Sequence, residues 1–86
     1  MKTFMIVFSG IDRDQLLEFL GTLPGHDKWF YSFENCIFEN TSLNAQQLGE
    51  GIRARFGDNM RIMITPMSGA EFWGFIPAEH IPLIIK

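Results

Sequence analysis

Residues 29–40 read WFYSFENCIFEN, a run with five aromatic side chains that is interrupted by the polar pair Glu34-Asn35. Apolar and β-preferring residues on both sides of a two-residue polar break predict a tight β-hairpin. Asn35 suits the turn because asparagine tolerates positive φ. We therefore expect strands at residues 28–33 and 36–40, and we interpret the rest of the chain around this hairpin.

Before the hairpin, the sequence predicts one strand and one helix. Apolar side chains alternate along residues 3–9, with Phe4, Ile6 and Phe8 on one face and Met5 and Val7 on the other. Two apolar faces are typical of a strand that is buried on both sides. Residues 12–22 predict a helix, since Asp12 and Gln15 have the spacing of a capping box. Its buried stripe is expected to consist of Leu16, Leu17, Leu20 and Leu23.

After the hairpin, residues 44–56 predict a second helix, in which Asn44 and Gln47 repeat the capping arrangement. Its apolar stripe is Leu48, Ile52 and Phe56. Gly49 and Gly51 weaken this helix, and either allow close backbone packing or are simply tolerated. A strand follows at residues 60–65, with Met60, Ile62 and Ile64 on one face and Met63 on the other. Residues 71–76 (EFWGFI) predict a further edge strand, followed by an extended or single-turn tail.

The resulting order is β-α-β-β-α-β with an additional C-terminal edge strand, which is the ferredoxin-like pattern of the α+β class. Eighty-six residues are enough for one domain, at residues 1–86. This pattern places both helices on one face of the sheet and leaves Met5, Val7 and Met63 on the other. Exposed apolar patches usually mark interfaces. We therefore expect a homodimer joined through sheet faces, an edge strand or both, with Trp73 as a further candidate interface residue.

Composition excludes some classes of protein. Hydrophobic residues at 47% and charged residues at 20% exclude a disordered chain. A net charge of −3 provides no general basic surface for nucleic acid. One cysteine forms no internal disulfide, which fits a reducing compartment. Residues 1–10 do not have the pattern of a secretory signal, and no apolar run reaches the length of a membrane span. We expect a cytoplasmic protein without a membrane partner.

Few residues indicate chemistry. No Cys or His spacing resembles a zinc site, and Ser9-Gly10 lacks the context of a nucleophile elbow. His26 and His80 are expected to be surface or loop residues, and Cys36 a small core residue. Asp12 is the one candidate catalytic residue: it either caps the first helix or holds Mg²⁺ together with its copy across a symmetric dimer. We expect no cofactor, and Mg²⁺ only in that second case.

Two groups of side chains could bind a ligand, but for each of them a structural role is the favoured interpretation. Arg53, Arg55 and Arg61 form either a phosphate-binding groove or a solvated face, and the second interpretation is favoured. The aromatic group at residues 72–75 could stack a base or a ligand, but such a group more often belongs to a core or an interface.

The chain from the hairpin to Phe75 resembles the SinR family, small relatives of the CRISPR-associated endoribonucleases. The resemblance is carried by WFY, ENCIFEN, SLNAQQL, NMRIMI and WGF. It implies a ferredoxin-like dimer and a link to nucleic acid. Those nucleases carry a metal-binding aspartate at the end of the first strand, where this chain has Ser9. Serine is a weak Mg²⁺ ligand, so the resemblance does not extend to cleavage unless Asp12 substitutes.

Three hypotheses for function follow. The leading one is a homodimer that acts by binding, as an adaptor or a subunit of a larger assembly, without catalysis. The second is a divalent-metal ribonuclease or toxin-type nuclease that uses Asp12. The third is a small-molecule-binding protein with a pocket at the dimer interface near Trp73.

Overall fold

The computed structural model describes residues 2–67 of the chain, apart from the side chains of residues 30–32. Six elements follow one another: β1 (Lys2–Ser9), α1 (Arg13–Leu20), β2 (His26–Phe33), β3 (Cys36–Thr41), α2 (Ala45–Phe56) and β4 (Arg61–Pro66). The sequence predicted this order. The strand expected at residues 71–76, the tail, Trp73 and His80 lie outside the described residues.

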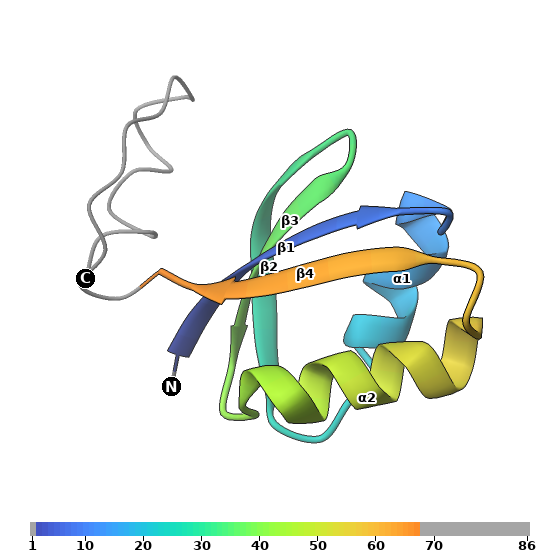
Figure 1. Cartoon of the computed structure of the whole chain (residues 1–86). Coiled ribbons are helices and arrows are strands. Elements are labelled where there is room, and N and C mark those ends of the chain that lie inside the picture. The colour runs from blue at the N-terminus through green and yellow to red at the C-terminus, as the bar shows by residue number, and fades with distance from the viewer. Residues whose placement is uncertain (1, 68–86) are drawn as a thin grey trace.

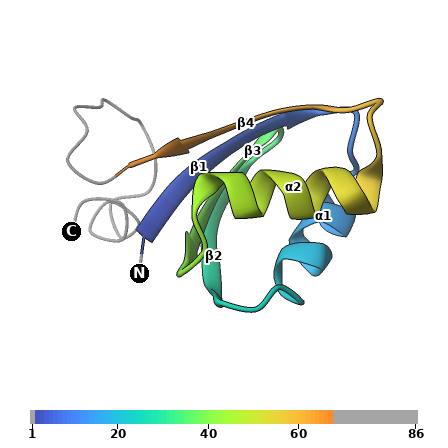
Figure 2. The same cartoon turned by 60° about the horizontal axis from the view of Figure 1, so that its bottom comes forward.

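The four strands form one antiparallel sheet in the order β2-β3-β1-β4 (Figure 1). β1 is central: its Ile6 lies opposite Ile37 of β3 on one side and Ile64 of β4 on the other. Both helices lie on the same side of the sheet, which Figure 2 shows from a second direction. The protein is therefore an α+β fold with a four-stranded antiparallel sheet and two helices.

The core lies between the sheet and the two helices. As predicted, one face of β1 is buried there, and the cluster consists of Phe4, Ile6, Phe8, Leu16, Leu20, Ile37, Leu48 and Ile52. The expectation that β1 is buried on both sides holds only in part: on the second face Thr3 is buried and Met5 is half-buried, but Val7 is 41% exposed. The helices cover one face of the sheet only, and Val7 lies on the other.

The two helices begin differently. At α2 the Asn44 side chain accepts a hydrogen bond from the Gln47 amide at 2.8 Å, and the Gln47 side chain accepts one from the Asn44 amide at 2.9 Å. The predicted capping box is therefore confirmed. At α1 the predicted box is wrong: the Asp12 side chain makes no capping bond. The helix starts there on backbone bonds alone, with Leu16 N–H donating to the Asp12 carbonyl at 3.0 Å.

The hairpin turn lies at Glu34-Asn35, as predicted, but its backbone differs from the expectation. Among the described residues, positive φ occurs only at Gly10, Gly25 and Gly57, so Asn35 does not use it. The Asn35 carbonyl accepts a hydrogen bond from Phe8 N–H at 3.1 Å. This bond joins the hairpin tip to β1, beyond the last paired residues of the two strands.

The glycines inside α2 are tolerated and are not required by packing. A Cβ at Gly49 would lie 3.7 Å from the Ile64 side chain, and one at Gly51 would lie 3.7 Å from Leu23. These are ordinary van der Waals distances, so alanine fits at both positions. The alternative of close backbone packing is therefore not supported.

We predict that Gly49→Ala and Gly51→Ala each stabilise the protein by about 1 kcal/mol, since alanine has the higher helix propensity. Each should raise Tm by roughly 4–8 °C in a domain of this size. Thermal unfolding followed by circular dichroism measures the effect. Ala54→Gly, at an exposed position of the same helix, is the matched control and should lower Tm by a similar amount. A Tm unchanged or lowered by Gly49→Ala would contradict the prediction.

Candidate functional site

A row of apolar side chains runs across the sheet on the face opposite the helices. The strand registers place Phe33 opposite Cys36, Cys36 opposite Val7, and Val7 opposite Met63. Each strand therefore contributes one residue, and neighbouring members are separated by one strand spacing, about 4.8 Å. We call Phe33, Cys36, Val7 and Met63 the apolar row.

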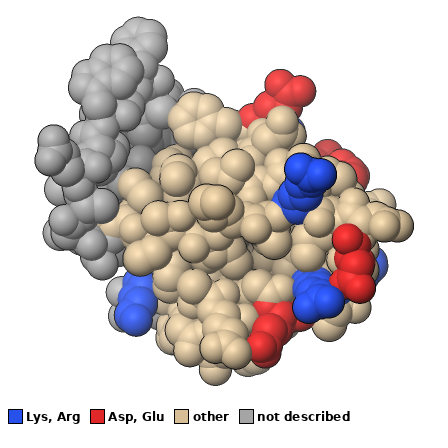
Figure 3. Space-filling view, viewed as in Figure 1, with Lys and Arg blue, Asp and Glu red and all other residues tan. Residues whose placement is uncertain are grey.

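The apolar row is accessible to solvent. Val7 and Phe33 are each 41% exposed and Met63 is 68% exposed, whereas Cys36 is half-buried. In the space-filling view, the middle of the visible face carries no charged side chain (Figure 3). Large apolar side chains left in contact with water are the usual mark of an interaction surface.

The other residues on the sheet face opposite the helices are less exposed than the apolar row. In the neighbouring rows, Phe38, Asn40 and Thr3 are buried and Met5 is half-buried. Of the four candidate interface residues predicted from the sequence, Val7 and Met63 are exposed, Met5 is less so, and Trp73 lies outside the described residues. The exposed part of the face is thus the end toward Ser9.

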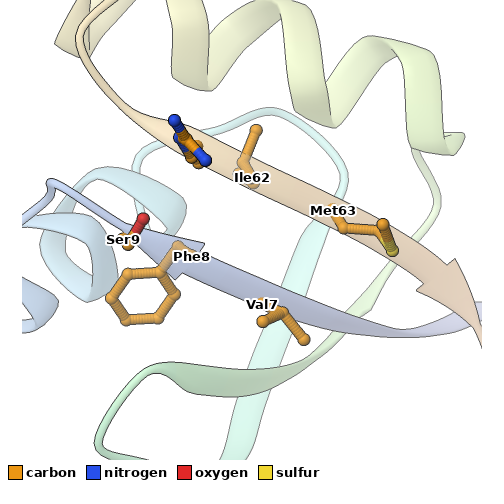
Figure 4. Close-up of a pocket in the computed structure, with 6 residues that line it drawn as sticks. Val7, Phe8, Ser9, Ile62 and Met63 are labelled. Atoms are coloured by element: carbon orange, nitrogen blue, oxygen red, sulfur yellow. The ribbon is translucent and has the colours of Figure 1, made fainter.

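A shallow hollow of about 260 Å³ lies beside Val7 and Met63, where β1 ends and β4 begins (Figure 4). Its lining is mostly apolar and consists of Val7, Phe8, Ser9, Arg61, Ile62 and Met63. Ser9 is the last residue of β1, as the sequence predicted, and lies opposite Arg61. The hollow extends the apolar row along the two strands.

Cys36 differs from the expectation of a core residue. It is half-buried in the middle of the apolar row, since alternation along β3 directs it to the face opposite Ile37. Partial burial raises the pKa of its thiol above the ordinary value. The neutral thiol is therefore the form present at neutral pH, and it contributes to the row as a small apolar group.

Asp12 lies at the start of α1. It is exposed, and within residues 2–67 no group of three or more His, Cys, Asp or Glu residues is arranged to hold a metal ion. The nuclease hypothesis requires Asp12 from two copies. It therefore stays a prediction.

The arginines at the end of α2 and the start of β4 lie on a solvated surface. Arg53 donates to the Asp58 carboxylate at 2.7 Å, and the Arg55 guanidinium lies 5.1 Å from the centre of the Phe56 ring. Arg61 is exposed. Two of the three side chains thus have local partners, which favours the interpretation as a solvated face.

The sequence interpretation missed a buried pair, His26 and Glu39. Glu39 is fully buried on the core face of β3, and its Oε2 is hydrogen-bonded to His26 Nδ1 at 2.7 Å. His26 begins β2, and its side chain is only 16% exposed, so the expectation of a surface histidine is wrong. Alternation along β3 places Glu39 on the same face as Ile37, and that signal could have marked it as a buried carboxylate.

The comparisons with known proteins add no family: no protein-family model, curated protein or solved structure matches this chain. Within residues 2–67, no helix is both long and apolar enough to cross a membrane.

Proposed function

We propose that this protein acts by binding, as a homodimer in which the apolar rows of two copies meet, and that it serves as an adaptor or a subunit of a larger assembly. A ferredoxin-like fold is part of the proposal. The strand order β2-β3-β1-β4 and the two helices on one face support it.

The observation that carries the proposal is the exposure of Val7 and Met63, which lie side by side on β1 and β4. Burying about 500 Å² of apolar surface on each copy would contribute roughly 12 kcal/mol per copy before the entropy of association is subtracted. That entropy offsets much of the gain. From the difference between these two free energies we expect a dimer of moderate affinity.

A second copy suits this surface better than a small ligand. The hollow beside Met63, about 260 Å³, is smaller than the usual ligand pocket of roughly 300–1,000 Å³. An isologous contact places the same patch on both sides, so apolar residues meet apolar residues and no buried charge is required. The hollow has the size to receive an apolar side chain from the other copy.

Within residues 2–67 the sheet ends at β2 on one side and at β4 on the other, and the difference between them favours β4 for any additional pairing between copies. The β2–β3 ladder has register shifts between His26 and Lys28 and between Trp29 and Tyr31, whereas β4 pairs with β1 without a shift. Irregular edges hinder pairing with another strand. The regular edge, β4, is also the one that carries Met63.

We predict that Met63→Lys and Val7→Lys each weaken dimerisation at least about tenfold, because a lysine in the row would have to be desolvated when the copies meet. Sedimentation velocity over a concentration series measures the association. Gln15→Lys, an equal charge change at an exposed position of α1, is the matched control and should dimerise like the wild type. A wild-type protein that stays monomeric at the highest soluble concentration would overturn the proposal, as would equal effects of all three variants.

A further inference from the structure

The Glu39 carboxyl has an environment that suits a neutral group better than an anion. Its side chain is fully buried, and only one oxygen, Oε2, has a hydrogen-bond partner, His26 Nδ1. The other oxygen, Oε1, is buried without a partner among the described residues. An ionised carboxylate in this position would lack the donors that it has in water, and its burial is therefore unfavourable.

The surroundings of the carboxyl provide one compensating charge and one opposing charge, both from β2. His26 favours the ionised form, and Asp27 disfavours it. In the sheet, Glu39 lies opposite two uncharged residues, Phe4 of β1 and Trp29 of β2, and uncharged Ile37 and Thr41 flank it on its own face of β3. Burial dominates, and the pKa of Glu39 is raised to about 7.

The same pair lies where the edge strand β2 begins. Gly25, just before it, has φ +86°, and its carbonyl accepts hydrogen bonds from Ser42 N–H at 2.9 Å and from Thr41 Oγ1 at 3.1 Å. The first register shift of the β2–β3 ladder comes directly after His26. The start of β2 is therefore held by a few specific bonds, and the bond between His26 and Glu39 is one of them.

We propose that Glu39 and His26 form a proton-dependent latch: with Glu39 neutral, the start of β2 is held closed on β3, and loss of the Glu39 proton weakens that hold. In the closed state the neutral carboxyl remains in the core and keeps its hydrogen bond to His26. Once Glu39 is ionised, contact of Oε1 with water stabilises the carboxylate. Water reaches Oε1 when the start of β2 separates from β3.

The direction of the pH dependence follows from the raised pKa. Between the ordinary pKa of about 4.5 and the folded value of about 7, the closed state binds more protons than the open state. The stabilisation of the closed state is therefore complete below pH 4.5, is lost as pH rises through this window, and reaches its low plateau above pH 7. The latch is tightest in acid.

Amide hydrogen exchange of the full chain tests the proposal, once corrected for the intrinsic pH dependence of exchange. The opening of residues 26–29 is expected to increase by more than about tenfold between pH 5 and pH 7 and to level off above pH 7. In Glu39→Gln, which keeps the shape of the side chain but cannot ionise, this increase should disappear. Glu50→Gln, at an exposed position of α2, is the matched control and should behave like the wild type.

A carboxyl carbon NMR titration of the wild type provides an independent measurement that does not depend on the folding of any variant. The proposal predicts that the Glu39 carboxyl titrates near pH 7, above its ordinary pKa of about 4.5. Two results would overturn the latch: a Glu39 carboxyl that titrates near its ordinary pKa of about 4.5, or an unchanged pH dependence of opening in a folded Glu39→Gln protein.

Discussion

Gly10→Ala is expected to destabilise the protein by about 2–4 kcal/mol, a large part of the stability of a small domain. Gly10 links β1 to α1 with φ +80°, a conformation that costs an L-residue about 1–2 kcal/mol. In addition, a Cβ at this position would lie 2.9 Å from the Asn59 carbonyl oxygen and 3.2 Å from the Met60 Cα. Both atoms belong to the backbone, so they cannot move aside as the end of a flexible side chain can.

Gly57→Ala separates the cost of the backbone conformation from the cost of the close contact that a Cβ would make at Gly10. Gly57 has φ +85°, close to the value at Gly10, but nothing lies within 4 Å of a Cβ built there. With ψ −168°, Gly57 lies in a region that is open almost only to glycine, so its substitution should cost only the conformational strain, about 1–3 kcal/mol. Urea unfolding of both variants measures the difference in the free energy of unfolding. Equal losses at Gly10 and Gly57 would show that the contact with residues 59 and 60 does not constrain the turn.

Ile6→Ala is expected to destabilise the protein by about 2–5 kcal/mol, because it would leave a cavity in the middle of the core. Ile6 is fully buried on the central strand and pairs with Ile37 and Ile64 on its two sides. The neighbouring residue, Val7, points to the other face. Val7→Ala should therefore cost less than about 1 kcal/mol, and the pair of variants tests which face of β1 carries the core.

Both variants should be measured by urea unfolding at one low protein concentration, since Val7 also lies in the proposed dimer interface. A loss at Val7 equal to the loss at Ile6 would mean that the two faces of β1 contribute equally to the folded monomer. That result would contradict the arrangement of one buried and one exposed face.

The core and the order of elements could be predicted because local patterns determine them. Alternation in β1 identified Phe4, Ile6 and Phe8, and spacing along α2 identified Leu48 and Ile52. The Asn44–Gln47 cap involves residues only three apart. In contrast, Asp12 has the same spacing to Gln15 and makes no cap, since such a pattern permits the bond but does not enforce it.

The candidate site could be predicted only in part. Alternation placed Val7 and Met63 on the face away from the helices, and both are exposed there. The row as a whole could not be predicted, because Cys36 was assigned to the core and the exact strand registers were unknown. The His26–Glu39 pair was missed for a related reason: the partners are 13 residues apart, and the β2 register shifts that position them leave no pattern in the sequence.

The most direct test of the central claim, that two copies meet through the apolar row, is an isotope-filtered NMR experiment on a mixture of labelled and unlabelled protein. Intermolecular NOEs should arise from the methyl groups of Val7 and Met63 and not from those of Leu48 or Ile52, which α2 buries in the core. An absence of intermolecular NOEs at high concentration, or NOEs that arise from the helical side alone, would contradict the account.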